Sequence, residues 1–479
     1  MRSVSLYFQV HKPLRLRKYR FFDIGTDHYY YDDYTNESLI RKAVDRSYIP
    51  ANKILLDLIK EYGSQFKITF SISGQVLDLF ELYAPDALES FQKLAATGVV
   101  EFTAEPNTHS LISLHNKQEF MQQVKEHERL IVQYFQKKPK VFANTALIYS
   151  NSIGEAVAEL GYNTVLIEGA KQILGWKSPN YLYYNIMNPR QRILLRNYQL
   201  SDDLSFRFGN RSWSEYPLTA EKYVQWISSL NKKEENVNIF VDYDIFGNIH
   251  SHDSGIFHFL KALPKQVIKS KMQFSTGNEV SSRLQPVAAL DIPHAVSWAD
   301  AEKDLSTWLG NELQKDAFNK LFSHSEKVKH ISDRKLQKDW KYLQSCDHFF
   351  YMSTRFFHDG HQGSPYESPY QAFINYMNVL SDFFIEVDKK SSFNNHNLIT
   401  KTTTTMAKKA TSKKSAKKGT KKATAKKAKA KKPAKKAAKK VVKKKAAPKK
   451  KKAAPKKKKA APKKKAVKKA VKPTITPLI

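Results

Sequence analysis

The first 300 residues carry short runs of apolar, β-branched and aromatic side chains, and several of these runs end at polar or ionisable residues. They predict strands at residues 4–10, 66–72, 99–102, 140–143, 164–167 and 237–243. Between them, apolar residues three or four positions apart predict helices at residues 54–62, 120–135, 153–160 and 222–230. Strands that alternate with helices of this length indicate βαβ units, and therefore parallel strands with right-handed crossovers.

Such units can close into a barrel or form an open sheet, and we favour a barrel over residues 1–297. The first strand is not followed by a glycine-rich turn of the dinucleotide-binding type. The ionisable residues also cluster after strand ends, where barrel enzymes place their sites.

The pattern changes after the predicted barrel. Residues 298–390 lack β-rich runs and carry helical patterns at 302–322, 333–344 and 368–387, which predicts a helical region packed on or beside the barrel. Residues 391–405 are rich in Ser, Asn and Thr and resemble a linker. In residues 406–479 an Ala-Ala-Pro-Lys motif recurs with a period of seven, and almost no large apolar side chain is present, so this tail is predicted to be disordered when free.

Charge separates the chain into two parts. The formal net charge is +36, and residues 401–479 hold 35 lysines and no acid, which leaves 46 basic against 45 acidic residues in the first 400. The body is thus nearly neutral and the tail is a polycation that would bind nucleic acid or another polyanion through phosphate-like contacts, without sequence preference. Its composition is similar to that of histone-like lysine-rich tails.

Cys346 is the one cysteine, which excludes an internal disulfide and favours a reducing compartment. No run of about 18 apolar residues occurs, and basic residues interrupt the first 30 positions, so no signal peptide or membrane span is predicted. These observations predict a cytoplasmic, soluble protein.

Several polar residues follow predicted strands and are candidates for chemistry. His11 follows the first strand, Asp78 comes after the second, and Glu101, Glu105 and His109 accompany the third. A histidine at a strand end is more often structural than functional. Each acid, taken alone, is more simply explained as a helix cap or first-turn charge.

The sharpest local pattern is an apolar strand that ends in Asp242, with Asp244 two residues later. Side chains two positions apart along a strand share a face, so the carboxylates would point together unless the chain turns between them. Two such carboxylates could keep one member protonated for general-acid chemistry. A pair of capping aspartates at a strand-to-helix turn explains the pattern equally well.

Several longer motifs resemble the α-amylase branch of glycoside hydrolase family 57, in the same order, from residue 1 to about residue 388. They include Asn144-Thr-Ala-Leu-Ile-Tyr, Val241-Asp-Tyr-Asp-Ile-Phe-Gly, Trp213-Ser-Glu-Tyr-Pro, the segment that begins Ser297-Trp-Ala-Asp, and Asp347-His-Phe-Phe-Tyr. His11-Lys-Pro is similar to the family's His-Gln-Pro signature, with lysine in place of glutamine.

This resemblance implies an incomplete (β/α)7 barrel followed by a helical region, and retaining chemistry on α-1,4-linked glucans. It implies that Asp242 is the proton donor and that the nucleophile position is occupied by Ala146, whose methyl group cannot form a glycosyl ester. Asp244 stands where the family usually has glutamate. Glu155 and Glu168 could replace the nucleophile only if the barrel brought one of them to the vacated position.

The resemblance also suggests substrate-binding residues, because sugar rings stack on aromatic faces and sugar hydroxyls bond to polar side chains. Most aromatic residues in a barrel belong to its core, but these candidates lie in the shared motifs: His11, His109, Trp213, Trp298, Asp347 and His348. No cofactor is expected, and no histidine pair has zinc-ligand spacing, so no metal is expected.

Three functional hypotheses remain. The chain is an α-glucan hydrolase or transferase with a substituted nucleophile, a relative that binds α-glucan or maltooligosaccharide with weak or no turnover, or a nucleic-acid-associated protein that acts through residues 406–479.

Overall fold

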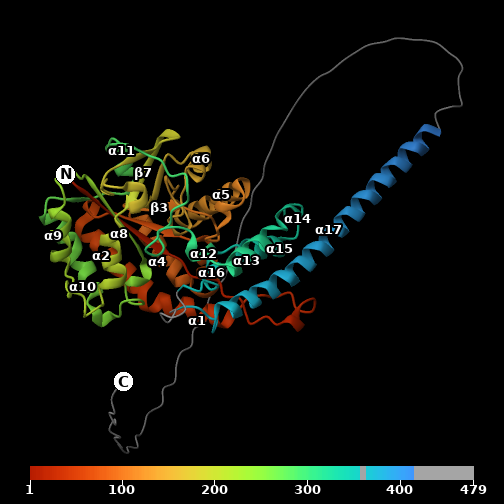
Figure 1. The fold of residues 1–479 in the computed structure, drawn as a ribbon, viewed down its shortest axis with the longest axis horizontal. Helices are drawn as coiled ribbons and strands as arrows, with labels where there is room; N and C mark the ends of the chain where they lie inside the picture. Colours follow the sequence, from red (N-terminus) through yellow and green to blue (C-terminus); the bar gives the residue numbers. More distant parts are fainter. Residues whose placement is uncertain (356–362, 415–479) are drawn as a thin grey trace, which may run out of the picture. The chain divides into compact units, whose positions relative to one another are not determined.

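A computed structural model describes residues 1–355 and 363–414, with side chains assigned through residue 391. Residues 1–409 form one compact unit. It contains a predominantly parallel β-sheet surrounded by helices (Figure 1).

Seven parallel strands close into a barrel in the order β8, β1, β2, β3, β4, β5, β7 and back to β8. Closure is made where Arg196 of β7 pairs with Asn238 of β8. The strands are β1 (Ser3–Val10), β2 (Ile68–Ile72), β3 (Val100–Ala104), β4 (Val141–Ala143), β5 (Thr164–Glu168), β7 (Asn188–Arg196) and β8 (Asn236–Asp242).

The expected (β/α)7 barrel is therefore confirmed, and all six sequence-predicted strands coincide with barrel strands. The seventh strand, β7, was not predicted. Three short strands lie outside the ring: β6 (Tyr183–Asn185) is antiparallel to β7, β10 (Ala289–Leu290) pairs with β6, and β9 (Gln273–Phe274) pairs with the start of β1.

Side chains alternate between the inside and the outside of the barrel, as the two-residue period of a strand requires. Tyr7, Leu166, Leu194 and Phe240 belong to one buried cluster contributed by four different barrel strands. Their neighbours along the strands pack instead into two larger clusters shared with the helices. Residues two positions further along these strands, at the carboxyl ends, therefore share the inward orientation.

Helices cover the barrel, and each predicted helix of the first 300 residues is present. The helices of this part are α1 (Asp33–Ala43), α2 (Ile49–Tyr62), α3 (Gly74–Tyr83), α4 (Pro85–Ala96), α5 (Lys117–Phe135), α6 (Asn151–Glu159), α7 (Lys171–Leu174), α8 (Tyr198–Asp202), α9 (Ala220–Ser229), α10 (Ile256–Lys269) and α11 (Gly277–Arg283). Side chains of Ser73, Asn116, Ser150 and Thr219 accept backbone N–H groups at the starts of α3, α5, α6 and α9.

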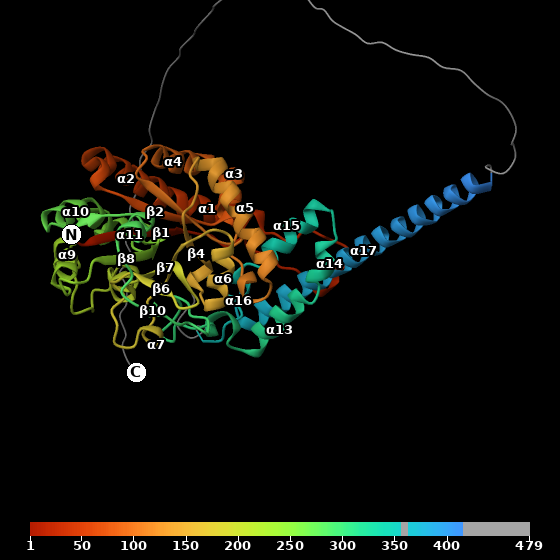
Figure 2. The same ribbon diagram turned by 90° about the horizontal axis from the view of Figure 1, so that it is seen from above.

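The remaining helices are α12 (Ser306–Leu309), α13 (Glu312–Phe322), α14 (Ser325–Lys329), α15 (Arg334–Leu343), α16 (Cys346–Phe350) and α17 (Pro369–Lys414). Figure 2 shows α13, α14 and α15 beside α17, and ring contacts such as Trp340 with Phe383 join them. The single helix predicted at 302–322 is wrong in its first half. Asn311 and Gln314 form a capping box that starts a new helix after Gly310.

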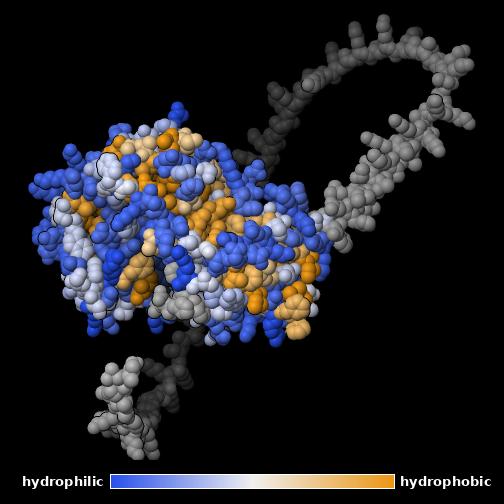
Figure 3. Space-filling view, viewed as in Figure 1, coloured by the Kyte–Doolittle hydropathy of each residue, from blue (hydrophilic) through white to orange (hydrophobic). Residues whose placement is uncertain are grey.

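Helix α17 continues through residues 391–405, where the sequence composition indicates a linker. The division of the chain into domains otherwise stays a prediction, and residues 415–479 of the predicted tail lie outside the described part. Figure 3 shows that one face of the molecule is mostly hydrophilic with separate apolar patches.

Candidate active site

Polar side chains from five barrel strands or the turns that follow them collect at the carboxyl end of the barrel. They are His11 after β1, Glu105 after β3, Glu168 at the end of β5, Arg196 at the end of β7 and Asp242 at the end of β8. Parallel strands place all these ends at one rim, which is where barrel enzymes carry out their chemistry. We therefore take this rim as the candidate active site.

Three of the predicted binding residues, His11, His109 and Asp347, lie in contact with one another. His11 Nδ1 lies 2.8 Å from Ser73 Oγ, and its Nε2 lies 2.9 Å from Asp347 Oδ2. The imidazole of His109 stacks on that of His11, with 4.1 Å between ring centroids. Burial acts to raise the pKa of Asp347, but His11, His109 and the Ser345 hydroxyl outweigh it and hold that pKa well below its usual range. Asp347 is therefore an anion that fixes the His11 ring.

Glu105 extends this cluster toward β2 and β3, and it is not the helix cap that the sequence suggested. Its Oε2 accepts a hydrogen bond from Ser71 at 2.9 Å and lies 3.9 Å from Nδ1 of His109. Burial raises the pKa of Glu105 to about 7, although Ser71 and His11 act in the opposite direction. Among the described residues, its Oε1 has no hydrogen-bond partner. When it is protonated, this carboxyl could donate a hydrogen bond through its O–H and accept one through its other oxygen.

The chain turns between Asp242 and Asp244. Residues Tyr243–Ile245 form a 3-10 turn, and Asp242 Oδ1 accepts the backbone N–H of Asp244 at 2.9 Å. Asp244 is buried and bonds to the Lys12 ammonium and to Asn248. Burial raises the pKa of Asp242, while Lys12 and His11 partly oppose this. Asp242 is thus a capping residue and also a candidate acid.

Ala146 lies in a turn with unusual backbone geometry directly after β4. Its φ is 49° and its ψ is 29°, and Leu147 also has a positive φ of 54°. This left-handed conformation costs roughly 1–2 kcal/mol for each residue with a Cβ atom. The turn is held by the Trp298 N–H, which donates to the Ala146 carbonyl at 3.0 Å, and by Thr145 Oγ1, which donates to Ser110.

A cavity of about 820 Å³ contains Asp242 and Trp298 in its wall, and Ala146 is not among its lining residues. The wall also includes residues that sequence reasoning missed, namely Arg196, Asp202, Asp300 and Lys303. The volume is within the range of small-molecule sites. Asp242 and Trp298 are the two predicted site residues that this cavity brings together.

Arg196 organises one side of the cavity. Its guanidinium donates to the Phe240 carbonyl at 2.9 Å, to Glu168 at 3.1 Å and to Asp202 at 2.6 Å. The same group lies 5.8 Å from the centroid of the Trp298 ring and fixes this aromatic face. The sequence contains a signal for Arg196 as a residue of this rim, because Arg196 directly follows the apolar run Ile193-Leu-Leu.

The two candidate replacement nucleophiles differ sharply in environment. Glu155 is exposed on α6, so it faces solvent outside the barrel. Glu168 is buried at the rim, where burial raises its pKa despite the opposing effects of Arg196 and Lys303. One oxygen of Glu168 accepts from Arg196, and the other has no partner among the described residues.

Trp213 and His348 are placed away from the described cavity wall. Trp213 packs on Trp226 of α9, with 6.0 Å between centroids, in the layer outside the barrel. His348 is buried, with Nε2 at 3.1 Å from the Tyr342 carbonyl and its ring beside Tyr376. Their substrate contacts stay predictions that this geometry does not favour.

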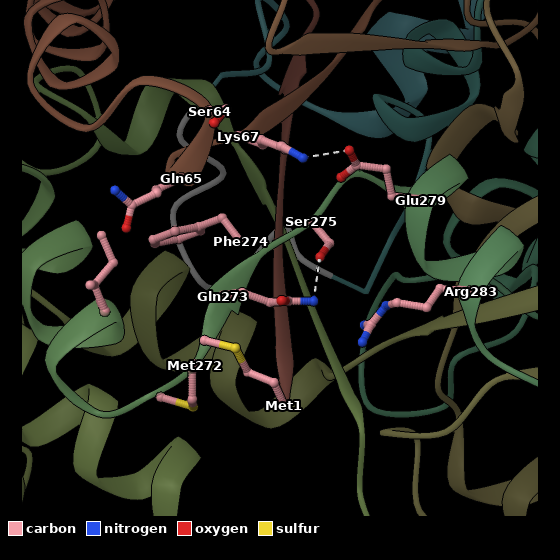
Figure 4. A pocket seen from close by; sticks show the side chains of 11 residues that line it. Met1, Ser64, Gln65, Lys67, Met272, Gln273, Phe274, Ser275, Glu279 and Arg283 are labelled. Carbon is pink, nitrogen blue, oxygen red and sulfur yellow. Dashed lines mark hydrogen bonds and ion pairs between the residues drawn. The ribbon is translucent and has the colours of Figure 1, made fainter.

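A separate hollow lies at the opposite end of the barrel, near the starts of β1 and β2 (Figure 4). Its volume is about 480 Å³, and it contains the Lys67–Glu279 ion pair. It contains none of the predicted site residues. Within the described residues, no group of three or more His, Cys, Asp or Glu is arranged to hold a metal ion.

The closed parallel barrel and the acid-containing cleft at its carboxyl rim define an α/β-barrel protein of the type that carries enzyme sites. The sequence model described as "Glycosyl hydrolase family 57" matches residues 5–293. The chain belongs to glycosyl hydrolase family 57.

One relative is a putative alpha-amylase of Methanocaldococcus jannaschii, which is 36% identical over an alignment of 417 residues that covers 82% of this chain and 87% of the relative. The fold is similar to a branching enzyme from Thermococcus kodakaraensis, with a TM-score of 0.59, 13% identity and coverage of 80% of this chain and 89% of that one.

The fold is also similar to a 4-alpha-glucanotransferase from Thermococcus litoralis, with a TM-score of 0.56 and 14% identity. That match covers 79% of this chain and 59% of the transferase, so this chain corresponds to little more than half of that enzyme's length. In the part of this chain that is described, no helix is long and apolar enough to cross a membrane.

Proposed function

We propose that this chain binds α-1,4-glucan or maltooligosaccharide in the cavity beside Trp298 and hydrolyses it weakly or not at all. The observation that carries the proposal is the half-buried acid Asp242 in the same cavity wall as Trp298, whose backbone N–H donates to the carbonyl of Ala146 in the strained turn. Family membership and the names of its relatives supply the substrate class.

Asp242 is suited to be the proton donor. A general acid must be protonated near its working pH and must face the substrate, and burial raises the pKa of this carboxyl at the wall of the cavity. The Asp244 backbone N–H fixes one of its oxygens. The indole of Trp298 in the same wall offers a flat apolar face to a sugar ring.

The missing group is a nucleophile. Retaining hydrolysis needs a second carboxyl about 5 to 5.5 Å from the acid, where it attacks the anomeric carbon. Ala146 has no oxygen in its side chain, and the absence of covalent attack costs several orders of magnitude in rate. Binding depends on the rest of the cavity and does not need this group.

A second candidate function is an active glycosidase or glucanotransferase with Glu168 as the substitute nucleophile. The partnerless oxygen and inward position of Glu168 favour it. Its ion pair with Arg196 opposes it, because attack would require this carboxylate to leave a buried guanidinium. Turnover that disappears in Glu168→Gln, in a variant that still binds maltoheptaose, would establish this second function.

Calorimetric titration of the full chain with maltoheptaose tests the first function. We expect saturable binding that Trp298→Ala weakens by about tenfold or more, because an aromatic sugar contact is lost. Trp176→Ala is the matched control, since Trp176 is 94% exposed and does not line the cavity. Equal affinity in both variants, or no binding by the unmodified chain, would refute the proposal.

A further inference from the structure

A second hollow of about 380 Å³ lies between the loop before α1, helix α3 and helix α15. We call it the tyrosine pocket, because Tyr29, Tyr31, Tyr83 and Tyr342 line it. It shares no lining residue with the cavity that contains Asp242. The tyrosine pocket is therefore a separate candidate for binding.

Each of the four tyrosine hydroxyls donates a hydrogen bond to a carboxylate in the pocket wall. Tyr29 and Tyr83 donate to Asp33 at 2.7 and 3.3 Å, Tyr31 donates to Asp339 at 2.7 Å, and Tyr342 donates to Asp78. The rings of Tyr29 and Tyr31 are nearly perpendicular, as are those of Tyr31 and Tyr342. The wall thus combines oriented aromatic rings with carboxylate oxygens at their edges.

Gln75 also lines this pocket. Its side chain is buried, and its Nε2 donates to the Lys12 carbonyl at 3.0 Å. Its Oε1 has no hydrogen-bond partner in the described part of the chain. A buried acceptor without a donor costs free energy, so Gln75 adds an acceptor with unused hydrogen-bonding capacity to this part of the wall.

The charges of the pocket favour a neutral ligand. Asp33, Asp78 and Asp339 are balanced by three basic residues of α15, namely Arg334, Lys335 and Lys338. Lys335 pairs with Asp339 at 2.9 Å, and Lys338 lies 3.7 Å from Asp78. An anion or a cation would have to compete with these pairs, whereas a hydroxyl can share their oxygens.

A pyranose ring matches these features, because it has apolar C–H faces and a rim of hydroxyls that both donate and accept. We propose that the tyrosine pocket is a second binding site for a neutral sugar segment of an α-glucan, either a free maltooligosaccharide or a branch of a longer polymer. The substrate class rests on the proposed function, while the pocket and its chemistry do not involve Asp242 or Ala146.

Two substitutions test the pocket without touching the cavity. Tyr29 is 45% exposed and Leu82 is 66% exposed, and both line the tyrosine pocket, so Tyr29→Ala and Leu82→Arg are expected to leave the fold intact. Tyr34→Ala is the matched control, because Tyr34 is 84% exposed and does not line the pocket. Each variant of the full chain is titrated with maltoheptaose and with glycogen by calorimetry.

We expect two binding events for the unmodified chain. Tyr29→Ala and Leu82→Arg should weaken one of them by about tenfold, and Trp298→Ala should weaken the other. Hydrogen exchange should show protection of α3 and α15 by maltoheptaose that is lost in Leu82→Arg. Loss of the glycogen event but not the maltoheptaose event would identify a polymer branch as the ligand.

The failures of the two proposals can be distinguished. One event that Trp298→Ala weakens and both pocket variants leave unchanged would overturn the second site and retain the proposed function. A pocket event without a cavity event would support the second site and contradict the proposed function. No binding to either glucan, or equal losses in Tyr29→Ala and Tyr34→Ala, would overturn the second site.

Discussion

Restoring a carboxylate at Ala146 tests the central chemical argument. Because alanine and glutamate both carry a Cβ atom, Ala146→Glu keeps the backbone cost of the left-handed turn at φ 49° roughly unchanged. The added side chain enters a site where Ala146 is only 3% exposed. We expect overpacking and charge burial to lower the free energy of unfolding by about 1–3 kcal/mol.

The gain in rate should be much larger than this loss in stability. A positioned carboxylate supplies covalent attack and a negative charge facing the oxocarbenium-like transition state, which together contribute about 4 kcal/mol or about a thousandfold in rate. The new carboxylate should also raise the pKa of Asp242 further, because like charges disfavour ionisation, and so help to keep the acid protonated.

The assay is release of reducing ends from maltoheptaose, together with mass spectrometry of a trapped glycosyl-enzyme. Ala146→Gln is the control of similar volume without the charge, and Ala146→Glu combined with Asp242→Asn measures the background. Circular dichroism checks that each variant is folded. Unmodified chain that is as active as Ala146→Glu, or equal rates for Ala146→Glu and Ala146→Gln, would refute the reasoning.

Four further results are expected. Ala146→Gly should raise the free energy of unfolding by about 1 kcal/mol in urea titrations, because glycine adopts a positive φ without a Cβ clash, and a loss of stability would contradict the strained turn. The pKa of Glu105, about 7, lies above its unfolded value, so its proton stabilises the fold at low pH and this contribution is lost as pH rises from about 4 to 7. As pH rises from 4 to 8, the free energy of unfolding of Glu105→Gln should therefore increase by on the order of 3 kcal/mol relative to that of the unmodified chain. A difference between the two chains that stays constant with pH would contradict the raised pKa. The pKa of Asp347 is depressed, so its contribution to the free energy of unfolding is present above about pH 4 and is lost as pH falls through the folded pKa. Asp347→Asn should lower the free energy of unfolding by about 3 kcal/mol at pH 7 and by progressively less in acid. A loss of stability that does not depend on pH would exclude the ion pair. Removing residues 406–479 should abolish salt-sensitive binding to duplex DNA or heparin in a mobility or fluorescence titration, and retained binding would place that activity in residues 1–405.

The sequence by itself was sufficient to predict the barrel and the polar residues at the carboxyl ends of its strands. Short apolar, β-branched and aromatic runs alternate with helical patterns, and this local information predicts parallel strands before any contact is known. It missed β7, whose first half is polar because it is partly exposed, and it merged α12 with α13 because hydrophobic spacing outweighed the Asn311 cap.

The tertiary structure decided which polar residues meet and which do not. It joined His11, His109 and Asp347, and it gathered Asp242 and Trp298 in one cavity with Arg196. It placed Trp213 and His348 elsewhere, because a motif shows only that a residue is present and not which face it occupies. The identity of Ala146 could be read from the chain, but the strain of its turn and the burial that shifts the carboxyl pKa values depend on segments far apart in sequence. Such properties arise only when strand ends converge and exclude water.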